Sequence, residues 1–154
     1  DVYRLSLLLG TSYRTTVRHL PNLKLAHGSN SAAWSKSSPA RLKAQLDFGY
    51  SQPESRSGDV WLLEPSFDGL KIELRPGDRV GLAHAAPPGA VIPSWLRAVE
   101  PTAKVGTATC RALFEARPVQ DSAFPASAVL NFEGWAVNVV LAEAPRGLDP
   151  RGSA

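Results

Sequence analysis

Residues that could support catalysis are few in this sequence of 154 amino acids, and they lie far apart. A zinc hydrolase needs two histidines one helical turn apart beside a carboxylate base, because that spacing puts both side chains on one helix face. The three histidines, His19, His27 and His84, do not have this spacing. We therefore interpret them as packed or solvated side chains and expect no metal or other cofactor in this chain.

The single cysteine, Cys110, is the other candidate for a nucleophile. It falls in a strand predicted over residues 107–116, where no helix N-terminus or neighbouring base would activate the thiol. One cysteine also cannot form an internal disulfide, which favours the reducing environment of the cytoplasm. We expect a buried structural thiol in a chain that is itself non-catalytic.

The most informative pattern lies in residues 5–23. Gly10 can adopt the positive φ that a tight turn needs, and Ser12 is a good N-cap for a following helix. In that second helix, Val17 and Leu20 fall on the inward face. The register is similar to that of a helix-turn-helix, in which a glycine-containing turn joins an apolar helix to a helix with polar outer residues.

The second of these helices carries the candidate binding residues. In a helix-turn-helix that reads DNA, the exposed start of this helix enters the major groove. We expect Ser12, Tyr13 and Thr15 to reach phosphates or bases. Arg14 and Arg18 would neutralise backbone charge. The same helix pair also serves as a protein-recognition module, so DNA and a protein partner are both retained as alternatives.

The charge is divided unevenly along the chain. Residues 1–50 contain seven Lys and Arg against two acidic residues, a net charge of +5. The remainder contains ten Lys and Arg against twelve acidic residues, a net charge of −2. A basic first third suits a polyanion or an acidic protein surface, although an ordinary solvated helical surface has the same composition.

The period of the apolar residues predicts two units of different class. The first part has helical spacing and includes a further helix over residues 39–46, with Pro39 at a favourable first position. Residues 51–59 contain no apolar side chain, which is typical of a linker. The predicted organisation is a basic helical, helix-turn-helix-like module over 1–50, a linker over 51–58, a β-sandwich over 59–145 and a tail over 146–154.

Short strands punctuated by Pro and Gly follow the linker. We predict an α+β protein whose second unit is an antiparallel, immunoglobulin-like β-sandwich, with a compact barrel as the competing architecture. Apolar runs of strand length or alternating pattern occur at residues 60–63, 70–74, 79–83, 107–116, 128–132 and 135–142.

The tryptophans of the second unit have two predicted roles. Trp61 and Trp135 lie on predicted strands and are expected in the core, because each ring buries a large apolar area. Trp95 follows Pro93-Ser94, and we expect it on an exposed loop as a contact for a protein partner. No apolar run approaches the ~20 residues of a membrane-spanning helix, so a membrane partner is not expected.

The chain resembles the C-terminal part of ImmA/IrrE-type proteins in three features. These are the Leu-Gly-x-Ser-Tyr run that begins at Leu9, the predicted helix 39–46 after Trp34, and the Asp59-Val60-Trp61 start of the β region. Members of that family open with a zinc metalloendopeptidase-like domain that carries a His-Glu-x-x-His helix, and they cleave or relieve repressors. The resemblance implies a zinc-binding helix upstream of Asp1, to which any zinc and any peptidase activity would belong.

The β region also resembles the chagasin-like, immunoglobulin-type inhibitors of papain-family cysteine proteases. Three loops fall in the order that the resemblance implies, at residues 86–89 with Trp95 downstream, at residues 105–107 and at residues 117–119. The match departs from the family pattern in two places. Pro88-Gly89 lacks a threonine pair, and Val119 replaces an aromatic residue, which weighs against inhibition.

We therefore expect the non-catalytic recognition and regulatory region of an ImmA/IrrE-like metallopeptidase. Its basic helices would dock on a repressor protein or on DNA, and its β domain would act as a sensor or interaction module. The alternatives are a stand-alone helix-turn-helix regulator that binds DNA, a chagasin-like inhibitor or interaction module, and a subunit of a larger assembly. The sequence does not determine the oligomeric state.

Overall fold

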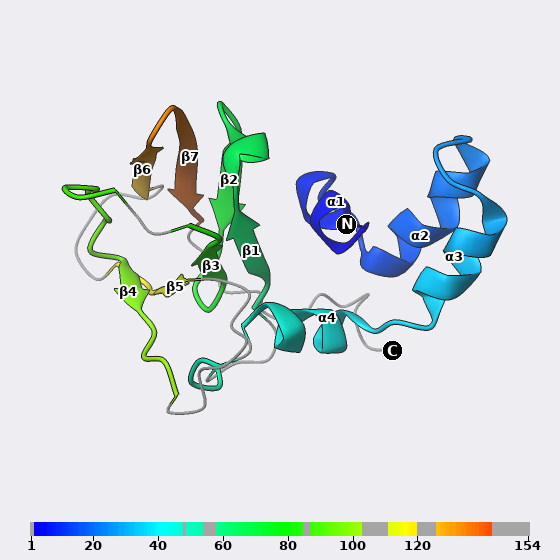
Figure 1. The fold of residues 1–154 in the computed structure, drawn as a ribbon, viewed down its shortest axis with the longest axis horizontal. Helices are drawn as coiled ribbons and strands as arrows, with labels where there is room; N and C mark the ends of the chain where they lie inside the picture. The colour runs from blue at the N-terminus through cyan, green and yellow to red at the C-terminus, as the bar shows by residue number, and fades with distance from the viewer. Residues whose placement is uncertain are drawn as a thin grey trace. The chain divides into compact units, whose positions relative to one another are not determined.

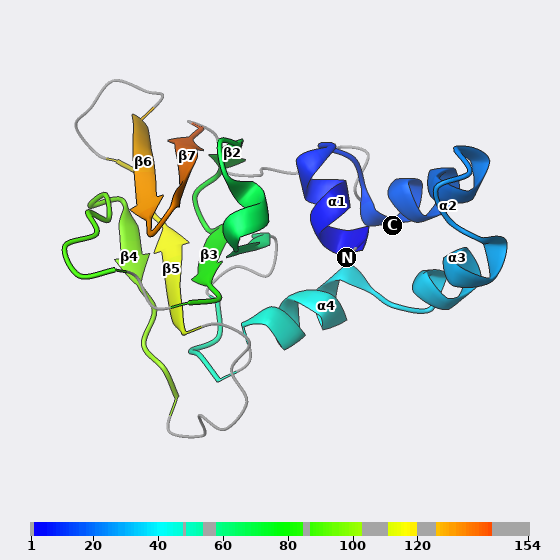
Figure 2. The ribbon, with the colours of Figure 1, turned by 45° about the horizontal axis from the view of Figure 1, so that its top comes forward.

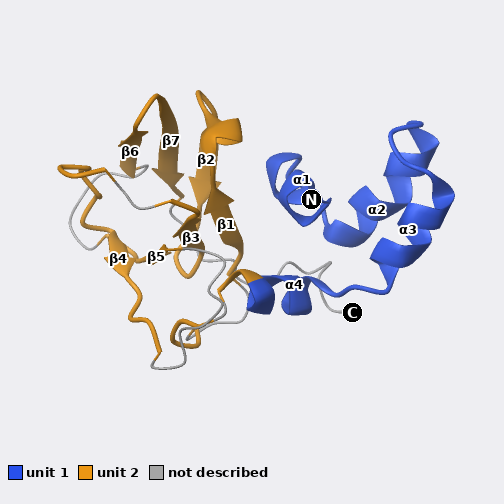
Figure 3. Cartoon of the chain, viewed as in Figure 1, with its two compact units in different colours: residues 1–45 blue, residues 46–154 orange. Residues whose placement is uncertain are grey.

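The computed structural model describes residues 2–47, 49–53, 58–84, 87–102, 111–119 and 126–142. The chain forms two compact units, residues 1–45 and residues 46–154 (Figure 3). The division falls before Tyr50, close to the boundary that the sequence predicts. Tyr50 is buried against Leu113 and forms an isolated antiparallel bridge with Pro101, so this segment belongs to the β unit. The predicted α+β class is confirmed, with helices in the first unit and strands in the second.

Four helices account for the first part of the chain, and three of them were predicted. They are α1 (Val2–Leu8), α2 (Tyr13–Asn22), α3 (Gly28–Ser35) and α4 (Pro39–Leu46) (Figure 1). The helix α3 was not predicted, because Gly28-Ser-Asn-Ser has the composition of a turn and the helix has long-range hydrogen bonds that the sequence does not reveal. The Ser31 hydroxyl donates to the Val17 carbonyl at 2.9 Å, and the Tyr13 hydroxyl donates to the Trp34 carbonyl at 3.0 Å.

The junction between α1 and α2 has the local geometry that the sequence predicts. Gly10 has a φ of +62°, and the Ser12 side chain accepts a hydrogen bond from the Thr15 amide at 3.1 Å. Val17 and Leu20 are buried. The helix α2 includes Pro21 and ends at Asn22. Pro21 has no amide hydrogen to donate to the Val17 carbonyl four residues earlier, and the Ser31 hydroxyl donates to that carbonyl instead.

The second unit contains two mixed sheets, so the predicted antiparallel pairing holds for only part of each sheet. One sheet has the order β1-β3-β5-β4 and the other has the order β2-β7-β6. The pairs β1–β3 and β2–β7 are parallel. Between β1 and β3 the chain leaves the first sheet, forms β2 in the second sheet and returns. The strand bounds are Val60–Leu63 (β1), Lys71–Leu74 (β2), Arg79–Leu82 (β3), Leu96–Ala98 (β4), Ala112–Ala116 (β5), Ala126–Phe132 (β6) and Trp135–Leu141 (β7), with a 3-10 turn at Pro65–Phe67.

The apolar side chains of alternate strand positions form the core of the β unit. On β7 the alternate residues Val137, Val139 and Leu141 are fully buried, whereas Asn138 is exposed. The corresponding rows on the other strands, such as Val80 and Leu82 on β3, are buried to the same degree. Figure 2 shows the strands β4 and β5 of one sheet and the hairpin of β6 and β7 of the other.

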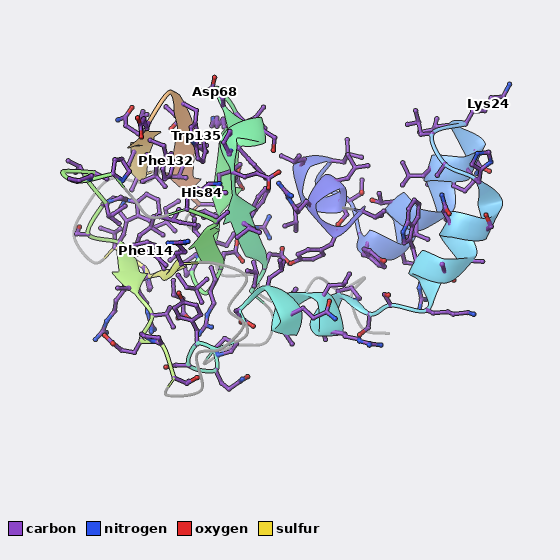
Figure 4. The ribbon with its side chains drawn as sticks, viewed as in Figure 1. Lys24, Asp68, His84, Phe114, Phe132 and Trp135 are labelled. Atoms are coloured by element: carbon purple, nitrogen blue, oxygen red, sulfur yellow. The ribbon has the colours of Figure 1, made fainter. Side chains whose placement is uncertain are left out.

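The tryptophans of the β unit occupy different depths. Trp61 is buried as predicted, and its ring meets Phe67 edge-on, with centroids 6.5 Å apart. Trp135 is only half-buried, at the turn of the β6–β7 hairpin, where it stacks on Phe132 with centroids 4.0 Å apart (Figure 4). The stacked pair therefore closes the end of the hairpin instead of filling the centre of the core.

The Pro76-Gly77 turn before β3 is stabilised by Asp78. This carboxylate is fully buried and accepts hydrogen bonds from the Asp59 amide at 2.8 Å and the Arg75 amide at 2.9 Å. Gly58 lies so close to this turn that a Cβ atom there would stand 2.0 Å from the Gly77 carbonyl oxygen. The start of β1 and the turn before β3 therefore depend on each other.

Several predicted features fall outside the described residues. These are Cys110, the strand residues 107–110, the middle of the predicted linker at 54–57 and the predicted tail at 146–154. Within the ranges that the structure describes, every helix is too short or too polar to cross a lipid bilayer.

Candidate nucleic-acid interface

The first turns of α2 present polar side chains to solvent. Ser12, Arg14, Thr15 and Arg18 are all exposed. Arg14 and Arg18 are four residues apart, so their side chains lie on the same face of the helix. The Ser12 and Thr15 hydroxyls are 2.8 Å apart, which places two further hydrogen-bonding groups at the helix start. The structure thus brings four of the five predicted binding residues of the helical unit to one accessible region.

Tyr13 is the exception among these residues. Its side chain is buried, and its hydroxyl donates to the Trp34 carbonyl of α3. Burial raises the pKa of this phenol above its ordinary value of 10.0, so the hydroxyl keeps the proton that it donates. Tyr13 therefore joins α2 to α3 instead of extending the exposed face.

The buried neighbours of Tyr13 hold the helix pair together. Thr16 is also buried, and its hydroxyl lies 2.7 Å from that of Thr11 in the turn. Val17 and Leu20 complete the inward face of α2, and Tyr3 and Ser6 are buried on α1. This packing fixes α2 from one side and leaves Arg14 and Arg18 on the other.

The charged side chains of this unit are almost all positive. Residues 2–45 contain seven Lys and Arg and no Asp or Glu. No carboxylate within that stretch can therefore neutralise Arg14 or Arg18. A surface of this composition produces a positive potential that attracts polyanions and is screened by salt.

Lys24 is a further cation of this unit, and its conformation was not predicted. It directly follows the C-cap of α2 and has a φ of +57°, which is unusual for a residue with a side chain. Its amide donates to the Pro21 carbonyl at 2.9 Å, and its side chain is exposed (Figure 4). The sequence Leu-Lys-Leu contains no glycine or asparagine that would have signalled this conformation.

The predicted protein contact at Trp95 is not exposed. The side chain is 8% exposed, and its carbonyl accepts a hydrogen bond from the Arg117 amide at 2.8 Å. The expectation that Trp95 lies on an open loop is therefore wrong. The reason is the short strand β4, which begins at Leu96 and was not predicted, because three residues are too few to show alternation.

The three histidines lie apart from one another in the sequence and at the surface. His19, His27 and His84 are all exposed, and in the described part of the chain no three His, Cys, Asp or Glu side chains gather as metal ligands. Comparison with models of protein families, with curated proteins and with solved structures found no match for this chain. What the protein does must therefore be inferred from the arrangement of its own residues.

Proposed function

We propose that α1 and α2 form a helix-turn-helix and that α2 docks in the major groove of duplex DNA. One observation carries the proposal: Arg14 and Arg18 are exposed on one helix face, in a stretch that has no acidic residue. Phosphate contacts from such arginines would supply much of the affinity for DNA, and the exposed Thr15 would contact base edges. The exposed start of α2 is the part of this motif that enters the groove.

In this proposal the chain is the recognition and regulatory region of an ImmA/IrrE-like protein, with any zinc peptidase activity supplied from a region upstream of Asp1. The chain itself is non-catalytic. We further propose that the β unit is an immunoglobulin-like interaction module, because its strands are divided between two sheets and sandwiches of that class present loops at both ends for contacts. A cytoplasmic location agrees with these roles.

A repressor protein is the second candidate partner for the helical unit. Leu8 and Leu9 are 46% and 59% exposed, directly before Gly10 in the turn that leads to α2. Apolar side chains beside a basic helix suit a protein surface better than a phosphate backbone. An acidic repressor surface would contact both groups.

Fluorescence anisotropy of a labelled DNA duplex, titrated with the full chain at several salt concentrations, tests the DNA proposal. We expect binding that weakens steeply with salt, and in the double variant Arg14→Ala/Arg18→Ala a slope smaller by about 2 in the plot of log K against log salt concentration. The double variant Lys36→Ala/Arg41→Ala removes the same charge from exposed positions of the same unit outside α2.

The two double variants separate specific docking from general attraction. Equal losses in both would mean that only net charge attracts the duplex and would contradict docking through α2. Absence of binding at low salt would eliminate DNA. Capture of a purified acidic repressor that depends on Leu8 and Leu9 would then favour the protein partner.

A further inference from the structure

A pocket of about 220 Å³ opens beside the sheet β1-β3-β5-β4. It lies wholly within the β unit and is separate from the helical residues of the proposed interface. Its charged lining includes three arginines and two glutamates. The polar residues that bear on its chemistry are Ser51, Arg79, Arg97, Glu100, Glu115 and Arg117.

The strand register places charged residues in one row across three strands. Arg79 on β3 pairs with Glu115 on β5, and Glu115 pairs with Arg97 on β4. Directly opposite residues project from the same face of a sheet, so the three side chains are neighbours. Arg79 and Glu115 are 3% and 5% exposed, whereas Arg97 is exposed. The row therefore runs from a buried guanidinium to a solvent-accessible one.

Hydrogen bonds within the chain use only part of the Arg79 guanidinium. Nε donates to Glu115 at 3.0 Å, and Nη1 donates to Asp47 at 3.2 Å and to the Ser51 carbonyl at 2.8 Å. Among the described residues, Nη2 has no acceptor, although a guanidinium carries five N–H donors. Because Arg79 lines the pocket, these two unused Nη2 donors are its candidates for hydrogen bonds to a molecule that enters.

Glu115 does not block this position. Its Oε2 atom is bound by Arg79, and its Oε1 atom lies 3.2 Å from Nη2 of Arg117. Both carboxylate oxygens are thus held by arginines of the protein. The donors that a ligand can use are therefore Nη2 of Arg79 and the guanidinium of Arg97 at the opening.

The balance of charge indicates what kind of anion would fit. Three arginines and two glutamates line the pocket, and Asp47, the second acidic partner of Arg79, balances the third arginine. A phosphate dianion would therefore meet strong repulsion from Glu100 and Glu115, whereas a singly charged carboxylate would meet less. The planar fork of a guanidinium also matches the geometry of a carboxylate.

The dimensions limit the ligand to a small molecule. At about 30 Å³ for each water in the liquid, the pocket corresponds to about seven water molecules. Ala98 and Val99 supply apolar wall beside the charged groups. We propose that this pocket binds a small organic monocarboxylate, with its carboxylate on Nη2 of Arg79 and on Arg97 and its carbon chain against Val99.

Isothermal titration calorimetry of the full chain with butanoate, benzoate, butanamide and inorganic phosphate tests this proposal. We expect millimolar or tighter binding of the two carboxylates and no detectable binding of the neutral amide. Arg97→Gln should weaken carboxylate binding by roughly tenfold or more, because it removes a charge-assisted hydrogen bond. Arg97 is exposed, so this variant is expected to fold normally, which circular dichroism would verify.

Arg111→Gln is the matched control, since it removes an exposed arginine that does not line the pocket, and it should leave binding unchanged. Glu100→Gln should raise the affinity for carboxylates and for phosphate a few-fold by removing a repulsive charge. The proposal is overturned if neither carboxylate binds, if butanamide or phosphate binds as tightly as they do, or if Arg97→Gln and Arg111→Gln bind alike. None of these outcomes depends on whether the helical unit binds DNA.

Discussion

The two units of this protein use arginine in opposite ways. In the β unit, Arg79 is buried and holds Asp47, Ser51 and Glu115 in one network. In the helical unit, Arg14 and Arg18 are exposed, in a stretch without a single acidic residue. Buried charges contribute to cohesion only when they are paired, whereas exposed and unneutralised charges remain available to a partner. The buried arginine of the β unit therefore serves stability, whereas the exposed arginines of the helical unit are suited to recognition.

The two units also differ in the burial of their side chains, which is more complete in the β unit. All of the largest fully buried side chains, such as Phe67, Ile72 and Leu113, belong to the β unit. In the helical unit, burial is confined to α1 and α2, and no described residue of α3 or of α4 is buried. Regions with few buried apolar contacts open at lower free energy, so we expect the helical unit to exchange its amide protons first.

The largest effect in this comparison should follow removal of the buried arginine. Arg79→Met leaves Asp47 and Glu115 without their shared cation, which should lower the free energy of unfolding of the β unit by about 3–5 kcal/mol. Urea unfolding, together with hydrogen exchange followed by mass spectrometry, would measure it. Arg97→Met removes an exposed arginine of the same row, and its expected cost is within about 0.5 kcal/mol. Similar costs for the two variants would contradict the cohesive role of Arg79.

A smaller effect is expected in the helical unit. Leu20→Ala removes a buried side chain between the helices, which should destabilise that unit by about 2–3 kcal/mol. Faster hydrogen exchange should be confined to residues 2–35, with unchanged exchange in the β unit. Leu23→Ala, at a position that is 65% exposed, is the control and should have almost no effect. If Leu20→Ala accelerated exchange throughout the β strands, the two units would not be independent.

The smallest expected effect is the contribution of Asp47 to the pH dependence of stability. Burial raises the pKa of this carboxyl above its ordinary value of 3.8, and the nearby Arg79 only partly opposes the rise. The folded chain therefore binds this proton more readily than the unfolded chain, so ionised Asp47 costs stability above the raised pKa. This cost should fade as the pH falls through that pKa toward 3.8.

Urea unfolding at a series of pH values, compared between the wild type and Asp47→Asn, would isolate this contribution. In the wild type, protonation of Asp47 should add stability as the pH falls. We expect Asp47→Asn to lack this gain. A wild type in which Asp47 instead stabilises the fold increasingly as the pH rises would contradict the raised pKa of this carboxyl.

Local signals in the sequence were sufficient for much of the helical unit. Gly10 at a positive φ, Ser12 as the N-cap and the inward Val17 and Leu20 all depend on residues within one or two turns of each other. The helix α3 was missed because it depends on hydrogen bonds from Ser31 and Tyr13 across the unit. The exposure of Arg14 and Arg18 follows from helical periodicity alone.

The features of the β unit that were not predicted are all long-range. Alternation located most strands, but it carries no information about which strand lies beside which. The parallel pairs and the network around Arg79 join residues that are far apart in the sequence, such as Asp47 with Arg79. For the same reason, the sequence could not indicate that Arg79, Arg97 and Glu115 meet at one pocket.

The parallel pairing of β2 with β7 has a consequence for synthesis of the chain on the ribosome. Lys71 to Leu74 must wait for Asn138 to Leu141 before their sheet can form. Domains generally fold as units as they emerge during translation, and a partner this distant in the sequence slows folding. The contacts of α2 with α1 and with α3 join neighbouring segments, so they need no distant part of the chain, whereas β2 emerges with an unpaired edge that promotes aggregation until β7 arrives.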